Sequence, residues 1–85
     1  MPRTARQPAK HPALKALGRR VRDLRQGKGL SQEALADRAG IGRSYMSGIE
    51  RGVRNCSTLQ LVKLARALSV KVGELFAKPS TPPPS

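Results

Sequence analysis

One stretch of the chain carries polar side chains at a spacing that would place them together on a helix. Arg43, Ser44 and Ser47 are adjacent or three to four positions apart, and residues at that spacing can share one helical face. A guanidinium can donate two hydrogen bonds to O6 and N7 of guanine, or it can bind a phosphate without reading the sequence. A serine hydroxyl can reach a base edge or a phosphate. Such a helix face can donate hydrogen bonds to acceptors such as phosphates and base edges, and for the arginine both kinds of contact stay open.

The chain lacks the residue types that catalysis needs. The chain contains a single His and a single Cys, too few for a zinc site built from thiolates or for a Cys and His constellation. A phosphate-binding loop of the glycine and lysine type is also missing. We therefore expect no enzyme activity, no metal site and no cofactor. Cys56 is expected to be a small buried filler, with redox sensing or an intermolecular disulfide as alternatives.

The charge balance points to a polyanionic partner. Seventeen Lys and Arg stand against five Asp and Glu, and the formal net charge is +12. Such a surplus attracts DNA, RNA and anionic membranes alike. Aromatic residues make up only 2% of the chain, which argues against the stacking platforms of RNA-binding domains. No apolar run approaches the roughly 18 residues of a membrane span, and no signal peptide is evident. We expect double-stranded DNA as the partner, a cytoplasmic location and no membrane contact.

The two ends of the chain differ in composition from its middle. Residues 1–12 are rich in proline and basic side chains, which predicts a flexible basic arm that is either solvated or laid along DNA. Residues 78–85 are rich in proline and predict a disordered tail. Residues 13–77 are left as one domain with a modest core.

The middle of the chain predicts helices only, because apolar residues recur at intervals of three and four. The expected elements are 13–26, 32–39, 43–51, a fourth helix capped by Ser57 or Thr58, and a short fifth helix or turn from Val70. The fourth helix is expected to bury an unusually broad apolar face that includes Leu59. The expected fold class is therefore all-α.

Residues 31–52 combine two short helices and a tight turn. The helices need a small side chain where they approach, supplied by Ala36, and a residue that tolerates positive φ at the turn, supplied by Gly40. The apolar side chains that fill the angle are those of Leu35, Ile41, Met46 and Ile49. This packing would turn the opposite face of the second helix, including Gly48, toward solvent, where it is free to enter a groove of DNA.

The segments LRQGKGLSQEALADRAGI, SYMSGIERG and STLQLVKLARALSVKVGELF follow one another in the chain. Their order and spacing resemble the Cro and phage-repressor (XRE-like) family of bacterial helix-turn-helix regulators over residues 14–76. The resemblance implies a compact five-helix, lambda-repressor-like fold in which the second and third helices form the reading unit. It also implies a small transcriptional regulator that binds double-stranded DNA as a homodimer on an inverted-repeat operator.

The resemblance also implies roles for individual residues. Gln32 is expected to contact a phosphate and brace the recognition helix, and Arg43 falls at a base-reading position. Tyr45 either donates its hydroxyl to the DNA backbone or packs. Glu50 lies on the inward side of its helix, where a carboxylate needs a partner, and the resemblance implies an ion pair with Arg25 that orients this helix. The residues implied to meet phosphates after the helix are Arg51, Arg54 and Asn55.

The sequence departs from the family pattern at three positions. Gly48 stands where relatives often carry a long polar side chain, so either the backbone approaches DNA closely or readout depends more on DNA shape and the basic arm. Gly42 replaces a frequent Ser or Asp N-cap, which predicts a weaker helix start. Cys56 replaces a frequent proline.

The last apolar residues exceed what a surface segment of this size needs. We expect them, with part of the fourth helix, to form the homodimer interface, and they are Val70, Val72, Leu75 and Phe76. Two other interpretations stay open. One is an antitoxin or controller that also docks onto a protein partner, and the other is a non-specific nucleic-acid binder.

Overall fold

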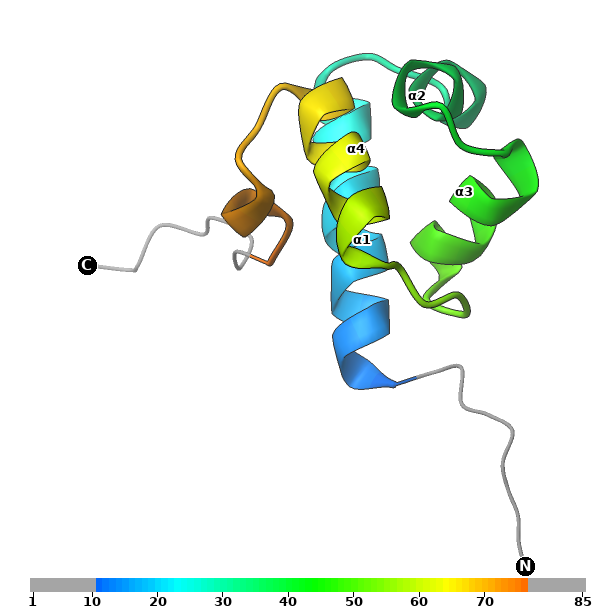
Figure 1. The fold of residues 1–85 in the computed structure, drawn as a ribbon, viewed down its shortest axis with the longest axis vertical. Helices are drawn as coiled ribbons and strands as arrows, with labels where there is room; N and C mark the ends of the chain where they lie inside the picture. Colours follow the sequence, from blue (N-terminus) through cyan, green and yellow to red (C-terminus); the bar gives the residue numbers. More distant parts are fainter. Residues whose placement is uncertain (1–10, 77–85) are drawn as a thin grey trace, which may run out of the picture.

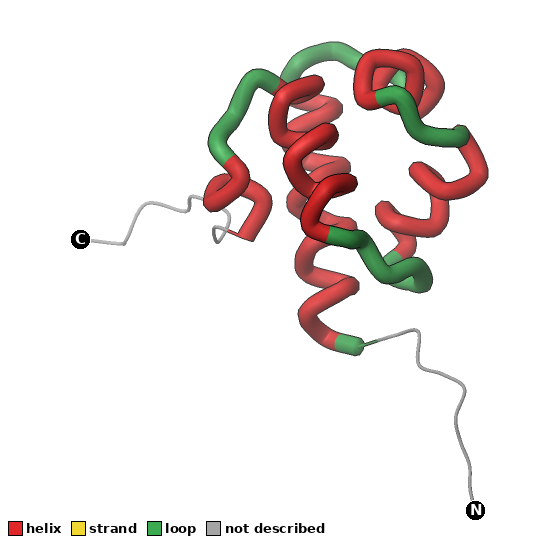
Figure 2. The backbone as a smooth tube through the Cα atoms, in the orientation of Figure 1, coloured by secondary structure: helices red, strands yellow, loops and turns green. Residues whose placement is uncertain are grey.

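The structure, a computed structural model, describes residues 11–76. It contains the α-helices α1 (Pro12–Gly27), α2 (Gln32–Ala39), α3 (Arg43–Arg51) and α4 (Thr58–Leu68), followed by the 3-10 helix η1 (Val72–Phe76) (Figure 1). Within these residues no strand occurs (Figure 2). The expected all-α class is confirmed, with a 3-10 turn as the fifth element. The predicted tail and all but the last two residues of the predicted arm lie outside the described residues.

Local side chains fix the starts of three helices. Pro12 occupies the first turn of α1, where its missing N–H leaves no bond unmade, and Nδ1 of His11 accepts a hydrogen bond from Ala13 N at 3.0 Å. The N-caps of α2 and α4 are Ser31 and Ser57, whose hydroxyl oxygens accept backbone N–H groups of the first turn. These helix starts therefore follow directly from short-range sequence.

Glycines delimit α3 on both sides. Gly40 ends α2 with φ 71° and ψ 36°, a left-handed conformation that glycine adopts without strain. Gly42 precedes α3 without a side-chain cap, as expected from the sequence. Gly52 ends α3 with φ 76°. Because the helix has nine residues and no cap at its start, its position depends on packing against α1 and α2.

Apolar side chains from all five elements meet in one core. Helix α3 packs on α1 and α2, α2 packs on α4, and η1 packs on α1 and α4. The buried apolar residues are Leu17, Val21, Leu35, Ala36, Ala39, Met46, Ile49, Leu64, Ala65, Ala67, Leu68 and Leu75. The residues expected to fill the angle between α2 and α3 are therefore in place, with Ile41 half-buried at the edge.

Helices α1 and α3 approach so closely at Gly18 that no side chain fits between them. A Cβ at this position would overlap the carbonyl oxygen of Ile49 and lie 2.6 Å from that of Glu50. The role of this glycine is not apparent from the helical pattern. Its available signal is a poor helix former placed between the apolar residues Leu17 and Val21 in the middle of an amphipathic helix.

The C-terminal segment closes the core. Leu75 is 0% exposed, so the prediction that it lies in a dimer interface is wrong, because α1 and α4 already cover η1 there. Val72 and Phe76 are 37% and 58% exposed, and Val70 is half-buried. Leu59, expected to be buried, is 61% exposed at the start of α4.

Arg20 fastens η1 to α1. Its Nε donates to the carbonyl oxygen of Glu74 at 2.8 Å, and its Nη2 donates to Oε1 of the same residue at 3.0 Å. The side chain of Arg20 is only 16% exposed. One arginine thereby binds both the backbone and the carboxylate of η1, a long-range contact that sequence analysis did not anticipate.

Candidate nucleic-acid interface

The outer face of α3 presents the polar side chains that the sequence predicts there. Arg43 and Ser44 are exposed and Ser47 is half-exposed. Nη1 of Arg43 lies 3.9 Å from Oε2 of Glu33 on α2, and both side chains are largely exposed. An exposed pair at this distance contributes little. The guanidinium of Arg43 therefore remains available to another acceptor.

Behind α3, three side chains form a hydrogen-bonded network. The carboxylate of Glu50 accepts hydrogen bonds from Nε and Nη2 of Arg25 at 2.6 and 3.0 Å. It also accepts one from Nε2 of Gln32 at 3.0 Å. Nη1 of Arg25 donates to the carbonyl oxygen of Leu30 at 2.8 Å. The predicted ion pair is present, and Gln32 extends it from α1 and α3 to α2. The network thus links three helices at the inner side of the recognition helix.

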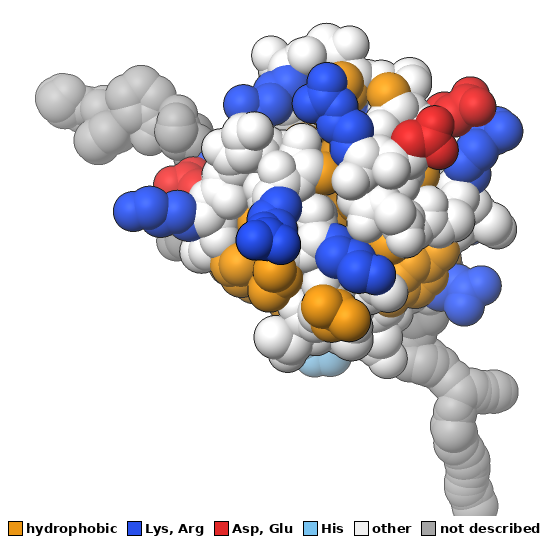
Figure 3. All heavy atoms as spheres, turned by 45° about the horizontal axis from the view of Figure 1, so that its top comes forward, with side chains coloured by type: hydrophobic (Ala, Val, Ile, Leu, Met, Phe, Trp, Pro, Cys, Tyr) orange, Lys and Arg blue, Asp and Glu red, His pale blue; other side chains and the backbone are white. Residues whose placement is uncertain are grey.

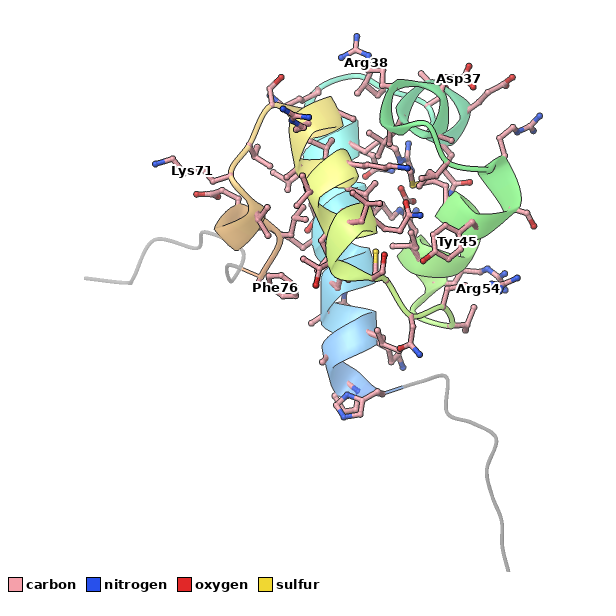
Figure 4. All side chains as sticks on the ribbon, viewed as in Figure 1. Asp37, Arg38, Tyr45, Arg54, Lys71 and Phe76 are labelled. Atoms are coloured by element: carbon pink, nitrogen blue, oxygen red, sulfur yellow. The ribbon has the colours of Figure 1, made fainter. Side chains whose placement is uncertain are left out.

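Tyr45 ties the loop after α3 back to the helix. Its hydroxyl donates to the carbonyl oxygen of Asn55 at 2.6 Å, and the guanidinium carbon of Arg54 lies 5.9 Å from the ring centroid. Figure 4 shows the two labelled side chains next to each other beside α3, with Arg54 pointing away from the core. Because the hydroxyl proton is used within the protein, the geometry favours the packing role of Tyr45 over donation to DNA.

Gly48 is buried, which corrects the expectation that it faces solvent. A Cβ there would overlap Cγ of Arg54 and lie 3.4 Å from its Nε. The stem of Arg54 therefore lies across α3 at this glycine. A close approach of DNA to a bare backbone at Gly48, one of the two possibilities raised by the sequence, is blocked by that side chain.

The charge distribution suits a polyanion. Arg51, Arg54 and Asn55 are exposed. On the face drawn in Figure 3, Lys and Arg side chains are spread over the surface with apolar side chains between them, and acidic side chains lie only near its edges. The structure thus places the proposed backbone-contacting residues at the surface, near the outer face of α3.

Cys56 is half-buried rather than fully buried. Burial raises the pKa of its thiol above the ordinary value, and the neighbouring Tyr45 hydroxyl opposes that shift. Burial also raises the pKa of the Tyr45 hydroxyl, with a further contribution from Cys56. Both groups are therefore protonated at neutral pH.

Residues 11–76 contain neither a metal-ligand cluster nor a membrane-spanning helix. Within that range, no group of three or more His, Cys, Asp or Glu side chains could hold a metal ion. No helix of the same range is long and apolar enough to cross a membrane.

A two-turn helix, a glycine turn and a second helix with an exposed polar face define a helix-turn-helix unit. Residues 21–75 match the family model HTH_3, described as Helix-turn-helix. The chain belongs to this helix-turn-helix family, and the resemblance inferred from the sequence is confirmed.

Relatives and solved structures agree with this assignment. The chain is 43% identical over 61 residues to the HTH-type transcriptional regulator y4dJ of Sinorhizobium fredii, covering 72% of this chain and 79% of the relative. It is 42% identical over 60 residues to the control protein C.BamHI of Bacillus amyloliquefaciens, covering 69% and 74%. The crystal structure of the restriction-modification controller protein C.AhdI from Aeromonas hydrophila superposes with a TM-score of 0.76 at 50% identity, covering 78% of this chain and 100% of that one.

Proposed function

We propose that this protein is a sequence-specific DNA-binding transcriptional regulator and not an enzyme. The observation that carries the proposal is the outer face of α3, where Arg43, Ser44 and Ser47 are accessible while the opposite face is fixed in the core. A helix of this size fits the major groove, where each base pair presents a distinct pattern of donors and acceptors. Membership of the helix-turn-helix family supports the same role, and such a regulator acts on the chromosome in the cytoplasm.

Phosphate contacts supply the remaining affinity in this proposal. Gln32 stands at the N-terminus of α2, whose first amides have no partner within the helix and favour an anion. Its side-chain amide has one hydrogen on Glu50 and a second left to donate. Arg51, the last residue of α3, and Asn55, in the loop after it, are exposed. Because Gln32 is bonded to Glu50, these phosphate contacts would gather near the C-terminal end of α3 and fix its register in the groove.

Selection of bound duplexes from a random pool tests the proposal. Several rounds at physiological salt should enrich one sequence, and the protein should bind it at least about a thousandfold more tightly than random duplex. Equal affinity for the enriched and random duplexes would contradict sequence-specific binding and favour a non-specific binder. A single-stranded RNA of the same sequence serves as the control for general attraction to polyanions.

We further propose that the regulator binds as a homodimer. One short recognition helix contacts few base pairs, and two copies related by a twofold axis would read an inverted repeat. The surface that supports this proposal is the exposed apolar part of η1, Val72 and Phe76, together with the flanking Val70. Leu59 on α4 is a further exposed apolar side chain.

Sedimentation of two charge variants tests the dimer. Phe76→Asp should lower the mass from that of a dimer to that of a monomer, because an unpaired charge would be buried in the interface. Gln26→Asp, on the exposed side of α1, introduces the same charge and should leave the mass unchanged. A wild-type protein that sediments as a monomer, or a Phe76→Asp variant that remains dimeric, would contradict this interface. Copurification of a different protein in equal amount would favour the antitoxin or controller interpretation.

A further inference from the structure

The backbone conformation at position 48 does not explain why a glycine stands there. Position 48 lies inside α3 and has no positive φ, so any residue could adopt its conformation. Glycine within a helix costs about 0.5 to 1 kcal/mol relative to alanine. The three nearest atoms that a Cβ would meet all belong to the side chain of Arg54. A glycine here thus makes room for that arginine.

The contact involves the part of Arg54 that cannot move aside alone. A methyl group at Gly48 would overlap Cγ, which is close to the backbone, and would approach Nε to 3.4 Å. Rotation about the first bonds of the side chain would carry the guanidinium away from its present place. A small substitution at position 48 would therefore displace the charged end of Arg54 as well as its stem.

Tyr45 supports the same arrangement from the other side. The guanidinium carbon of Arg54 lies 5.9 Å from the ring centroid, a distance at which a cation is attracted to the ring face. The ring is held in turn by the hydrogen bond from its hydroxyl to Asn55 O at 2.6 Å. The Arg54 side chain therefore lies between the backbone of Gly48 and the ring of Tyr45, and it remains exposed to solvent.

We propose that Gly48 is a positioning residue that seats Arg54 on the outer face of α3, and that Arg54 reads a base there. Gly48 directly follows Ser47 and is four residues after Ser44, so a side chain that crosses it joins the polar face that enters the groove. The planar guanidinium, held at one orientation, can donate two hydrogen bonds to O6 and N7 of guanine. Arg54 would thus supply from the loop the long polar side chain that α3 itself lacks at position 48.

This inference rests on the proposed DNA binding, and its first test needs no DNA. The side-chain NMR signals of Arg54 should be displaced by the ring current of Tyr45 in the free wild-type protein. Gly48→Ala should return those signals to the values of an unstacked arginine, whereas Gly27→Ala should not change them, because nothing lies within 4 Å of a Cβ at Gly27. Unchanged Arg54 signals in Gly48→Ala would overturn the positioning role. This measurement stays informative even if DNA binding itself fails.

The second test compares variants on the enriched duplex. Arg54→Ala and Gly48→Ala should each lower affinity for it by about tenfold while affecting random duplex less. If Gly48 acts through Arg54, the double variant should bind like Arg54→Ala alone, and multiplied losses would overturn the proposal. Arg54→Lys keeps the charge without the planar fork, so it should retain binding to random duplex and lose preference. Equal losses on all duplexes for Arg54→Ala would show a phosphate contact and overturn base readout.

Discussion

Arg25 and Glu50 form a two-pronged ion pair across the contact between α1 and α3, with Nε to Oε2 at 2.6 Å and Nη2 to Oε1 at 3.0 Å. Their side chains are 11% and 3% exposed. Hydrogen bonding to Glu50 raises the pKa of Arg25, against the effect of burial, so the arginine stays charged. The pair fixes α3 from its inner side while the outer face remains free for DNA.

Removal of one partner of this pair should therefore lower the free energy of unfolding. Glu50→Ala leaves the Arg25 charge buried without its carboxylate, and we expect a loss of about 3 to 5 kcal/mol in the free energy of unfolding. Glu33→Ala removes the same charge from an exposed, distant pair and should cost less than about 1 kcal/mol. Urea unfolding of both variants measures the difference. Equal losses would mean that burial of the pair is unimportant.

Gly18 should be intolerant of even a methyl group. Gly18→Ala would force α1 away from the backbone of Ile49 and Glu50, and we expect a net destabilisation of about 1 to 3 kcal/mol together with weaker DNA binding. Gly27→Ala lies in the same helix with free space around it, and it should be neutral or stabilising by up to about 1 kcal/mol. Thermal unfolding of the two variants decides between close packing and simple helix propensity, since propensity alone would stabilise both.

Base reading by Arg43 and phosphate binding by Arg51 should give different effects on DNA binding. Arg43→Ala should lower preference for the enriched duplex about 5- to 150-fold, because a base contact is worth roughly 1 to 3 kcal/mol. Arg51→Ala should weaken binding to all duplexes and reduce the slope of log affinity against log salt by about one. Binding titrations at several salt concentrations measure both effects. The same profile for the two variants would refute the assigned roles.

The Cys56 thiol should be slow to react in the folded protein. Since burial raises its pKa, less thiolate is present, and alkylation at pH 8 should be several-fold slower than in urea-unfolded protein. A pKa that is higher in the folded state gives a contribution to stability that is complete below the ordinary value of 9.0 and is lost as pH rises through the folded-state pKa.

The pKa of the Tyr45 hydroxyl is also raised in the folded state, from its ordinary value of 10.0. Its contribution to stability is therefore lost above that value in the same way. The free energy of unfolding should fall on the alkaline side of pH 9. Urea titrations between pH 7 and 11 measure this, and Cys56→Ser, which has no thiol to ionise, should show only the later part of the decline. Alkylation as fast in the folded as in the unfolded protein would contradict the protection of Cys56.

The sequence alone determined the helices and which face of residues 43–51 stays outside the core. Serine caps, the proline at the start of α1 and the left-handed Gly40 act over a few residues, so their effects can be predicted locally. The outward face of Arg43, Ser44 and Ser47 follows from helical periodicity once Met46 and Ile49 are assigned to the core. For the pairing of Arg25 with Glu50, the sequence needed the help of family resemblance.

Tertiary structure decided the features that join residues far apart in the chain. Whether Leu75 faces the core or a partner depends on how α1 and α4 cover η1, and short apolar segments do not encode that choice. The glycines at 18 and 48 have ordinary helical backbones, and only the neighbours brought to them by folding show why a side chain is excluded. Periodicity tells which way a residue points along its own helix, whereas what it meets there is fixed by packing of the whole chain.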